Sequence, residues 1–290
     1  MTLRRLSPCK VNLVLNILGK RPDGYHGLET LFHPVPLHDE LTFESNGAGI
    51  HLTCNHPDLP TDSSNLVHKA ASLYFQSAGV HAGVRIHLDK RLPLAAGLGA
   101  GSANAAHTLL ALNELFGSPL PESQLGTLAA SLGSDVNFFL QDAPALATGR
   151  GEQVEPLAPF NALKGTWILL FHPGFGIATA WAYRELSHHP DALNGRPGRA
   201  LEFARLLESG RLEDAGRALY NSLEAPALRK YPVLGLYQEF LRAHGAFGAL
   251  MSGSGSTTFA LFRTEAAARQ AAATFRIEFG AAGWLGLAAL

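Results

Sequence analysis

A glycine-rich stretch at residues 93–106, PLAAGLGAGSANAA, is the segment best suited to bind a phosphorylated ligand. Its glycines allow positive φ angles and let backbone N–H groups approach a ligand closely. The apolar periodicity of residues 102–116 predicts a helix directly after them, and the unpaired amides and dipole at a helix start attract anions. These features point to a triphosphate. Taken alone, the segment could instead be a turn packed against its own helix.

The spacing of these glycines matches neither of two common phosphate motifs. It differs from the dinucleotide pattern G-x-G-x-x-G, and no lysine stands where the pattern ending in GK[ST] requires one. A third kind of phosphate loop is therefore required. A second loop of glycine and serine, LMSGSGST at residues 250–257, lies between two predicted strands. As a hairpin loop it would need no ligand.

Charged and aromatic residues elsewhere could act on such a ligand. Lys10 and Asn12 share one face of a predicted strand, although Lys10 alone could be a strand-end residue reaching solvent. Asp135 follows a predicted helix that ends at Gly133, and its carboxylate could accept a hydroxyl proton or simply form a turn. In the turn RPDGYHG at residues 21–27, Tyr25 and His26 could stack on a pyrimidine ring and hydrogen-bond to its edge.

The elements that must position these residues follow from periodicity and end signals. We expect strands at residues 10–18, 84–88, 166–171, 245–251 and 257–262, and helices at 63–79, 102–116, 121–133, 199–223, 232–244 and 264–276. The predicted buried stripe of the first helix is Leu66, Ala70, Leu73 and Ser77, and that of the second is Ala105, Leu109, Leu112 and Phe116. Thr264 could cap the last helix. Residues 147–165 are rich in Gly, Pro and polar residues, which predicts a domain boundary near residues 150–165.

In this order, the segments at Lys10, residues 93–106 and residues 250–257 resemble the three motifs of the galactokinase, homoserine kinase, mevalonate kinase and phosphomevalonate kinase superfamily. Within it, the chain resembles the 4-diphosphocytidyl-2-C-methyl-D-erythritol kinases. Seven ordered matches carry this resemblance from about residue 7 to 262, at residues 8–13, 21–26, 93–106, 133–139, 147–152, 172–174 and 252–262. Together they are far more specific than any single motif.

The resemblance implies an ATP-dependent kinase that phosphorylates the 2-hydroxyl of 4-diphosphocytidyl-2-C-methyl-D-erythritol in non-mevalonate isoprenoid (terpenoid) biosynthesis. The implied fold is α/β (α+β), a two-domain small-molecule kinase. Residues 1–155 would form the N-terminal ATP-binding domain with the phosphate loop, and residues 156–290 a C-terminal ferredoxin-like domain. Mg²⁺ is expected with ATP, held largely by phosphates and water, and no protein ligand is assigned.

Site residues carry over position by position. The implied catalytic pair is Lys10 and Asp135, with the lysine keeping the carboxylate ionised and stabilising the reacting oxygens. ATP binding is assigned to Asn65, Pro93, Leu94, Ala95, Ala96, Gly97, Leu98, Gly99, Ala100, Gly101, Ser102 and Ala103, and substrate binding to Asn12, Tyr25, His26, Thr179 and Tyr183. The cytosine would lie between Tyr25 and Tyr183, with Trp181 as the competing choice for the second aromatic.

The chain departs from the family pattern at three of these matched segments. The family usually has Ala where Cys9 stands, Ser where Ala103 stands and Pro where Asn137 stands. None of these changes removes a proposed catalytic group. Because Ala103 lacks a hydroxyl, Ser102 alone can donate a hydroxyl there, and backbone N–H groups must carry most of the phosphate binding.

Amino-acid composition limits the classes of molecule that the protein is expected to bind. The 290 residues hold 23 Lys+Arg against 24 Asp+Glu and are only 16% charged, which argues against nucleic-acid and membrane partners and leaves a small-molecule substrate. No apolar run reaches a membrane span, and the N-terminal sequence does not read as a signal or transit peptide. Two cysteines favour a reducing, cytoplasmic setting. The thirteen histidines show no metal-ligand spacing and are expected to be scattered.

Two other functions remain open from the sequence. One is another kinase of the superfamily, acting on a mevalonate-like or homoserine-like alcohol, which Tyr25 and His26 disfavour. The other is a catalytically silent nucleotide-binding sensor, which would need neither Lys10 nor Asp135.

Overall fold

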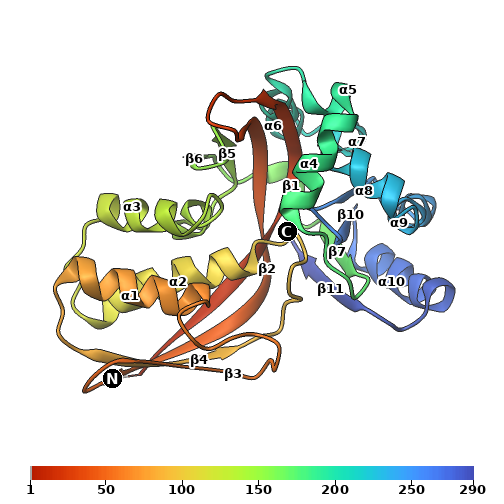
Figure 1. The fold of residues 1–290 in the computed structure, drawn as a ribbon. Helices are drawn as coiled ribbons and strands as arrows, with labels where there is room; N and C mark the ends of the chain where they lie inside the picture. Colours follow the sequence, from red (N-terminus) through yellow and green to blue (C-terminus); the bar gives the residue numbers. More distant parts are fainter. Residues whose placement is uncertain (1) are drawn as a thin grey trace. The chain divides into compact units, whose positions relative to one another are not determined.

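The computed structural model describes residues 2–290, which form two compact units, each assembled from several stretches of the chain. The first unit takes residues up to 9, 38–92 and 99–142; the second takes 10–37, 93–98 and 143–290. Strands β1 (Thr2–Lys20) and β2 (His26–Asn46) are long enough to contribute to both. Strands and helices mix in each unit, so the α/β (α+β) prediction is confirmed (Figure 1). The division at residue 155 into an ATP-binding and a second domain stays a prediction.

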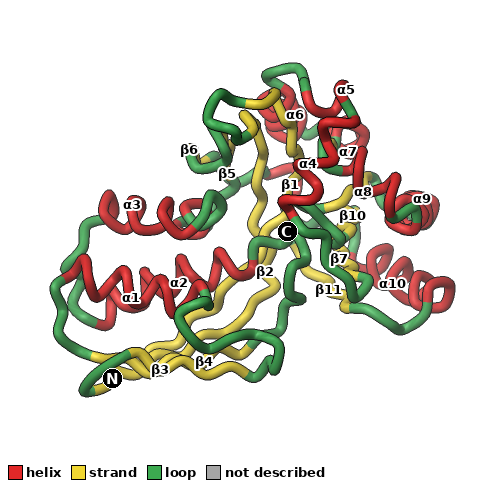
Figure 2. The backbone as a smooth tube through the Cα atoms, viewed as in Figure 1, coloured by secondary structure: helices red, strands yellow, loops and turns green. Residues whose placement is uncertain are grey.

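In the first unit, two helices lie beside the strands and a third packs on those two helices (Figures 1 and 2). Strand β4 (Gly83–Asp89) pairs antiparallel with β2 and parallel with β3 (Ile50–Cys54), within a sheet of order β3-β4-β2-β1-β8. The helices are α1 (Leu66–Ala78), α2 (Ala100–Leu115) and α3 (Glu122–Leu132), followed by a short 3₁₀ turn at Asn137–Leu140. All three were predicted to within a few residues. This layer places the helix that follows the glycine-rich stretch against a sheet.

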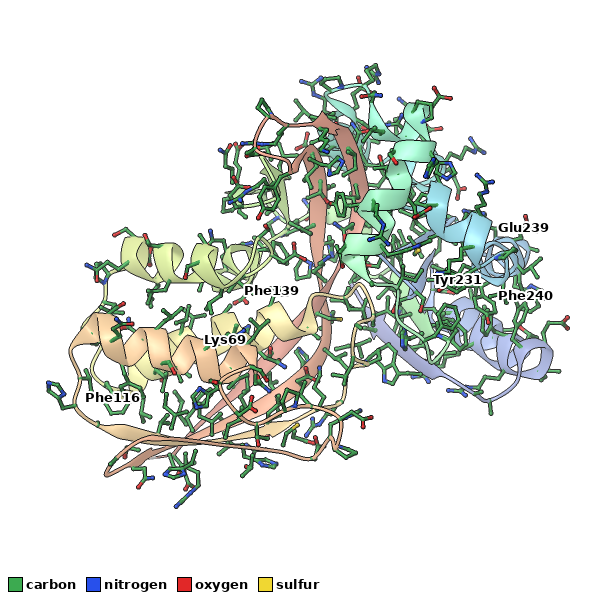
Figure 3. The ribbon with its side chains drawn as sticks, viewed as in Figure 1. Lys69, Phe116, Phe139, Tyr231, Glu239 and Phe240 are labelled. Carbon is green, nitrogen blue, oxygen red and sulfur yellow. The ribbon has the colours of Figure 1, made fainter. Side chains whose placement is uncertain are left out.

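The buried face of α1 differs from the predicted stripe. Ala70 is buried as expected, but Val67, Ala71 and Tyr74 complete the buried face, while Leu73 is half-buried and Ser77 exposed. An aromatic contact explains the rotation, because Tyr74 stacks on Phe116, with ring centroids 6.3 Å apart. Figure 3 labels Phe116, which lies just beyond the end of α2. The predicted stripe of α2 is confirmed for Ala105, Leu109 and Leu112; Phe116 lies just past the helix and is half-buried.

The second unit contains an antiparallel sheet of order β11-β7-β10-β9. Its strands are β7 (Trp167–His172), β9 (Gly248–Met251), β10 (Thr258–Phe262) and β11 (Trp284–Ala289). Alternate residues such as Phe171 and Phe262 pack with α9 (Val233–Ala243) and α10 (Glu265–Phe279), so both helices cover one face. Thr264 caps α10 by accepting a hydrogen bond from the Ala267 amide, as predicted. This strand–helix–strand–strand–helix–strand order confirms the ferredoxin-like prediction.

Side chains between these two helices are mostly aromatic. Phe240 on α9 meets Phe275 and Phe279 on α10, with ring centroids 5.7 and 5.3 Å away. Such edge-to-face pairs add to the stabilisation from burial of their area. They fix the helical layer behind the strands that carry the second glycine-serine loop.

The remaining segments correct one prediction, the helix at residues 199–223. Residues 147–165, near which the sequence predicts a domain boundary, overlap strand β5 (Ala145–Thr148) and include strand β6 (Gln153–Pro156), and β5 pairs with β2. The predicted helix at 199–223 divides into α6 (Arg199–Glu208) and α7 (Leu212–Ala218) and ends in strand β8 (Tyr220–Asn221). Gly210, at φ +75°, breaks the helix, and pairing of Tyr220 with Val14 of β1 draws the next residues into the sheet. Shorter helices follow β7: α4 (Thr179–Glu185), α5 (Pro190–Leu193) and α8 (Glu224–Lys230).

Within residues 2–290, no helix combines the length and apolar character that crossing a membrane would need.

His107 on α2 is a buried titratable group of the first unit. It is 7% exposed, and neither ring nitrogen has a hydrogen-bond partner among the described residues. Burial lowers the pKa of His107 to about 4. The unfolded chain takes up this proton near its ordinary pKa of 6.5, so between pH 6.5 and 4 the unfolded state binds more protons. Stability is therefore lost as pH falls through this window, by roughly 3 kcal/mol for this one group.

We expect His107→Leu to reduce the loss of stability that occurs as the pH falls below 6.5. Thermal melts at pH 7 and pH 5 should show a smaller loss of Tm in this variant than in the wild type, because the proton-binding group is gone from the unfolded state. His51→Leu, which changes an exposed histidine, is the control and should keep the wild-type loss. An unchanged loss in His107→Leu would contradict the assignment.

Candidate active site

Lys10 on β1 is buried in the second unit, with 3% of its surface exposed. Its Nζ donates to Asn12 Oδ1 at 2.7 Å and to the carbonyl of Gly97 at 3.4 Å. It also lies 5.0 Å from the centre of the Phe32 ring. An ammonium group is buried only where such partners offset its lost hydration. The possibility that Lys10 is a strand-end residue reaching solvent is therefore excluded.

Asn12 holds this lysine in place through a short relay. Its Nδ2 donates to Thr30 Oγ1 at 2.8 Å, and that hydroxyl donates to the carbonyl of Val14 at 2.6 Å. Asn12 and Thr30 are both buried, at 2% and 1% exposure. The relay fixes the orientation of the Asn12 amide, whose oxygen then faces Lys10. Sequence reasoning missed Thr30, because nothing in its neighbourhood distinguishes it from an ordinary strand threonine.

The predicted phosphate loop meets β1 at the backbone. The amide of Lys10 donates to the carbonyl of Leu98 at 3.0 Å, and Ala96 and Leu98 are buried. Gly97 has φ +77°, which a side chain would strain. The first part of the loop, residues 93–98, is therefore anchored to the strand that carries Lys10.

The second glycine-serine loop meets the same residues from the other end of the chain. Ser252 Oγ donates to the carbonyl of Gly97 at 2.9 Å, and the amide of Thr257 donates to the carbonyl of Ala96 at 3.3 Å. A Cβ atom on Gly97 would lie 2.1 Å from the Ser252 carbonyl oxygen, and one on Gly253 would lie 2.9 Å from the Gly97 oxygen. The glycines of both loops thus permit a backbone contact that no other residue type would allow.

Two further residues form hydrogen bonds with the backbone of residues 251–253. Asn221 Nδ2 donates to the carbonyls of Met251 and Gly253, both at 2.8 Å. Glu224 accepts from the Met251 amide at 2.8 Å, and burial raises the pKa of its carboxyl group. The sequence carried no signal for either residue, since each acts on a loop about 30 positions away.

The start of α2 belongs to the first unit and carries the rest of the predicted phosphate loop. Gly99, at φ +69°, occupies the N-cap position, where it offers no side chain to the first-turn amides. Asp and Glu are absent from the first turn. Amides at an uncapped helix start, with the positive end of the helix dipole, suit an anion. The sequence placed this helix correctly.

Asn65 and Asp135 also lie in the first unit. Asn65 caps α1, where its Oδ1 accepts from the Val67 amide at 2.8 Å and its Nδ2 donates to the Pro60 carbonyl at 2.6 Å. A role on the adenine side of ATP stays a prediction. Asp135 follows α3 in the turn before the 3₁₀ segment and is half-buried. Its pairing with Lys10 stays a prediction as well.

The turn at residues 21–27 presents aromatic groups in the second unit. Arg21 Nη2 pairs with Asp23 at 3.0 Å, which lowers the pKa of that carboxyl group, and Asp23 Oδ1 accepts from the Tyr25 amide at 3.1 Å. Tyr25 is 57% exposed, and the Arg150 guanidinium lies 4.8 Å from its ring centre. Arg150 comes from the 147–152 motif, which sequence reasoning left without a role. The two motifs thus meet at Tyr25.

His26 meets Tyr183 of α4, with ring centroids 5.1 Å apart and planes inclined at 37°. Burial is the main cause that lowers the pKa of His26, and Lys20 adds to it. Trp181 instead faces Lys230, whose Nζ is 4.2 Å from a ring centre of the indole. Of the two candidate aromatics, Tyr183 is therefore the one next to the 21–27 turn. Stacking of a base between Tyr25 and Tyr183 stays a prediction.

Thr179, the first residue of α4, links this aromatic group to the glycine-serine loop. Its Oγ1 lies 2.9 Å from Ser254 Oγ. Among residues 2–290, no group of three or more His, Cys, Asp or Glu side chains is arranged to hold a metal ion.

Comparisons with known proteins agree with this geometry. The model for the N-terminal domain of GHMP kinases matches residues 65–150, and the model for their C-terminal domain matches residues 203–281. A 4-diphosphocytidyl-2-C-methyl-D-erythritol kinase from Pelotomaculum thermopropionicum is 42% identical over 277 residues, covering 95% of this chain and 94% of its own length. The chain belongs to the 4-diphosphocytidyl-2-C-methyl-D-erythritol kinase family. It is therefore a kinase, with ATP as phosphoryl donor.

Other relatives are consistent with this membership. An enzyme of the same name from Synechococcus is 41% identical, covering 94% of this chain and 89% of its own. A crystal structure titled 4-(cytidine 5'-diphospho)-2C-methyl-D-erythritol kinase superposes with a TM-score of 0.80 at 38% identity, covering 99% of this chain and 100% of its own. A homoserine kinase from Cytophaga hutchinsonii, at 20% identity and a TM-score of 0.78, covers 99% of this chain and 94% of its own and shares the fold.

The close approach of Gly97 to Ser252 predicts that Gly97→Ala strongly lowers kcat/KM. A methyl group there would force residues 97 and 252 apart, and a displacement near 1 Å at a phosphate loop costs about 10²-fold in kcat/KM. Steady-state kinetics with ATP as the varied substrate measures this loss.

Gly165→Ala is the matched control, because Gly165 has a similar φ of +81° but nothing within 4 Å of its Cβ position. It should lower Tm through backbone strain and leave kcat/KM near the wild-type value. Equal kinetic losses in the two variants would show that strain at positive φ, and not the contact with Ser252, explains the effect.

Proposed function

We propose that this chain transfers the γ-phosphoryl group of ATP to the 2-hydroxyl of 4-diphosphocytidyl-2-C-methyl-D-erythritol, a step of non-mevalonate isoprenoid precursor biosynthesis. The observation that carries the proposal is the meeting of Lys10, Gly97 and Ser252, which unites three distant segments around one buried ammonium group. The names of relatives at about 40% identity supply the substrate.

Lys10 and Asp135 carry the chemistry in this proposal. As the bond to phosphorus forms, the Asp135 carboxylate accepts the proton of the substrate hydroxyl. The Lys10 ammonium, oriented by Asn12, stabilises negative charge on the attacking oxygen and the transferring group. A buried, fixed ammonium suits this task because it needs little reorganisation during the reaction.

The phosphates of ATP bind to backbone amides in our proposal. Residues 97–103 supply amides of the loop and of the first turn of α2, and Ser102 adds a hydroxyl. Mg²⁺ accompanies ATP. Oxygens of ATP and water would supply most of its ligands, which is usual for Mg²⁺.

The cytosine ring binds at the turn of residues 21–27. Tyr25 offers an exposed ring for stacking, and the His26 and Tyr183 pair forms a second aromatic surface in the same unit. Such a surface has a clear use with a cytidyl substrate and none with mevalonate or homoserine. It therefore favours the cytidyl substrate over the other alcohols phosphorylated in the superfamily.

Asp135→Asn tests the chemical step. Loss of the proton acceptor should lower kcat by about 10²- to 10⁴-fold, while ADP binding, measured by calorimetry, stays near the wild-type affinity. Asp214→Asn makes the same change at a surface carboxylate on α7 and should leave kcat unchanged. If Asp135→Asn turns over at the wild-type rate, the base lies elsewhere.

Tyr25→Ala tests the cytosine site. Stacking of one base on an aromatic ring is worth about 1–3 kcal/mol, so CDP affinity should fall about 5- to 150-fold, with ADP affinity unchanged. Tyr220→Ala removes another tyrosine whose ring lies beside an arginine, Arg199, and should not affect CDP affinity. CDP and ADP competing for a single site in the wild type would favour another kinase of the superfamily. So would faster turnover of mevalonate or homoserine.

A further inference from the structure

Asp39 on β2 is a buried carboxylate, fully shielded from solvent, that the catalytic proposal does not use. Its Oδ1 accepts hydrogen bonds from the amides of Arg91 and Leu92, both at 2.8 Å. Its Oδ2 accepts from Asn104 Nδ2 at 3.1 Å and from the buried ammonium of Lys90. Four donors therefore converge on one side chain, all of them within the first unit.

Two of these donors lie directly on either side of the predicted ATP-binding segment. Leu92 immediately precedes the predicted ATP-binding segment, residues 93–103, and Asn104 immediately follows it. Asp39 thus binds both ends of that segment and closes it into a loop. Restricting both ends removes conformational freedom that ATP binding would otherwise have to remove.

The charge of Asp39 is compensated, and a second residue supports Asn104. Lys90 is 8% exposed and compensates the charge of Asp39, so that no isolated negative charge is buried next to the ends of a segment that binds anions. Ser7 on β1, fully buried, donates to Asn104 Oδ1 at 2.7 Å. Both polar atoms of the Asn104 side chain are therefore used, which fixes its orientation on the first turns of α2.

We propose that Asp39, with Asn104 and Lys90, is a positioning group that sets the shape of the 93–103 loop for ATP. This inference rests on the proposed function, because it assigns ATP to that loop. None of the three residues is among those assigned to bind ATP or substrate, and they act through the two ends of the loop.

A matched pair of substitutions on α2 tests the proposal. Asn104→Ala removes the two hydrogen bonds at the loop end of the helix. Asn113→Ala removes two hydrogen bonds to Leu120 near the other end, about 13 Å away by helix rise. Both asparagines are buried, so both variants should lose stability. We expect only Asn104→Ala to raise KM for ATP, by about tenfold, with KM for the cytidyl substrate unchanged.

Hydrogen exchange in the absence of ligand gives a readout that does not need the activity. Amides of residues 93–103 should exchange faster in Asn104→Ala and at the wild-type rate in Asn113→Ala. Equal effects of the two variants on KM for ATP and on exchange would overturn the proposal, since they would reflect general destabilisation. If the wild type phosphorylates no cytidyl substrate, the proposed function fails. The exchange comparison still tests whether Asp39 and Asn104 hold the ends of the 93–103 loop.

Ser7→Ala keeps the test decisive if Asn104→Ala does not fold. It removes only the hydrogen bond to Asn104 Oδ1. It should raise both KM for ATP and the exchange rate of residues 93–103, each by a smaller factor than Asn104→Ala does. No change in either quantity would overturn the proposal.

Discussion

The carbonyl oxygen of Gly97 accepts hydrogen bonds from Lys10 Nζ and Ser252 Oγ, and the rest of the candidate site depends on this shared acceptor. It joins a residue near the N-terminus, the glycine-rich loop and a loop near the C-terminus. The approach is close enough that residue 97 must be glycine. The glycines therefore do two things: they expose backbone amides to a ligand, and they let the loop reach the strand that carries Lys10. Asn12 and Thr30 then orient the ammonium, and Asn221 and Glu224 hold the opposite loop.

Charged residues are few in this kinase, and some of the shielded carboxyl groups orient backbone segments. Only 16% of the residues are charged, which excluded a basic surface as the means of binding phosphates. Three shielded carboxyl groups instead accept hydrogen bonds from the backbone at loops and helix ends: half-buried Glu224 from Met251, and buried Asp39 and Glu29 from Leu92 and from Gly198 before α6. Such charge-assisted bonds are stronger than neutral ones and hold their partners in defined positions.

Local patterns predicted the features that depend on neighbouring residues. Helix α2, the cap at Thr264 and the shared face of Lys10 and Asn12 all follow from spacing within a few positions. Features that depend on distant partners could not be predicted. The rotation of α1 depends on Phe116, and strand β8 exists because Tyr220 pairs with Val14. Nothing near Asp39 or Asn221 in the sequence indicates which loop each one holds. The resemblance to a family recovered the site motifs but not the residues that support them.

In the proposed function, the donor phosphates bind the backbone of the glycine-rich loop, while the cytidyl group binds the turn of residues 21–27. Hydrogen–deuterium exchange of the wild type with a non-hydrolysable ATP analogue, and separately with CDP, measures this directly. We expect the analogue to slow exchange of amides in residues 96–103, together with residues 252–257 that contact them, and CDP to slow exchange around residues 23–28. Unchanged exchange at residues 96–103 with the analogue bound would contradict this proposal.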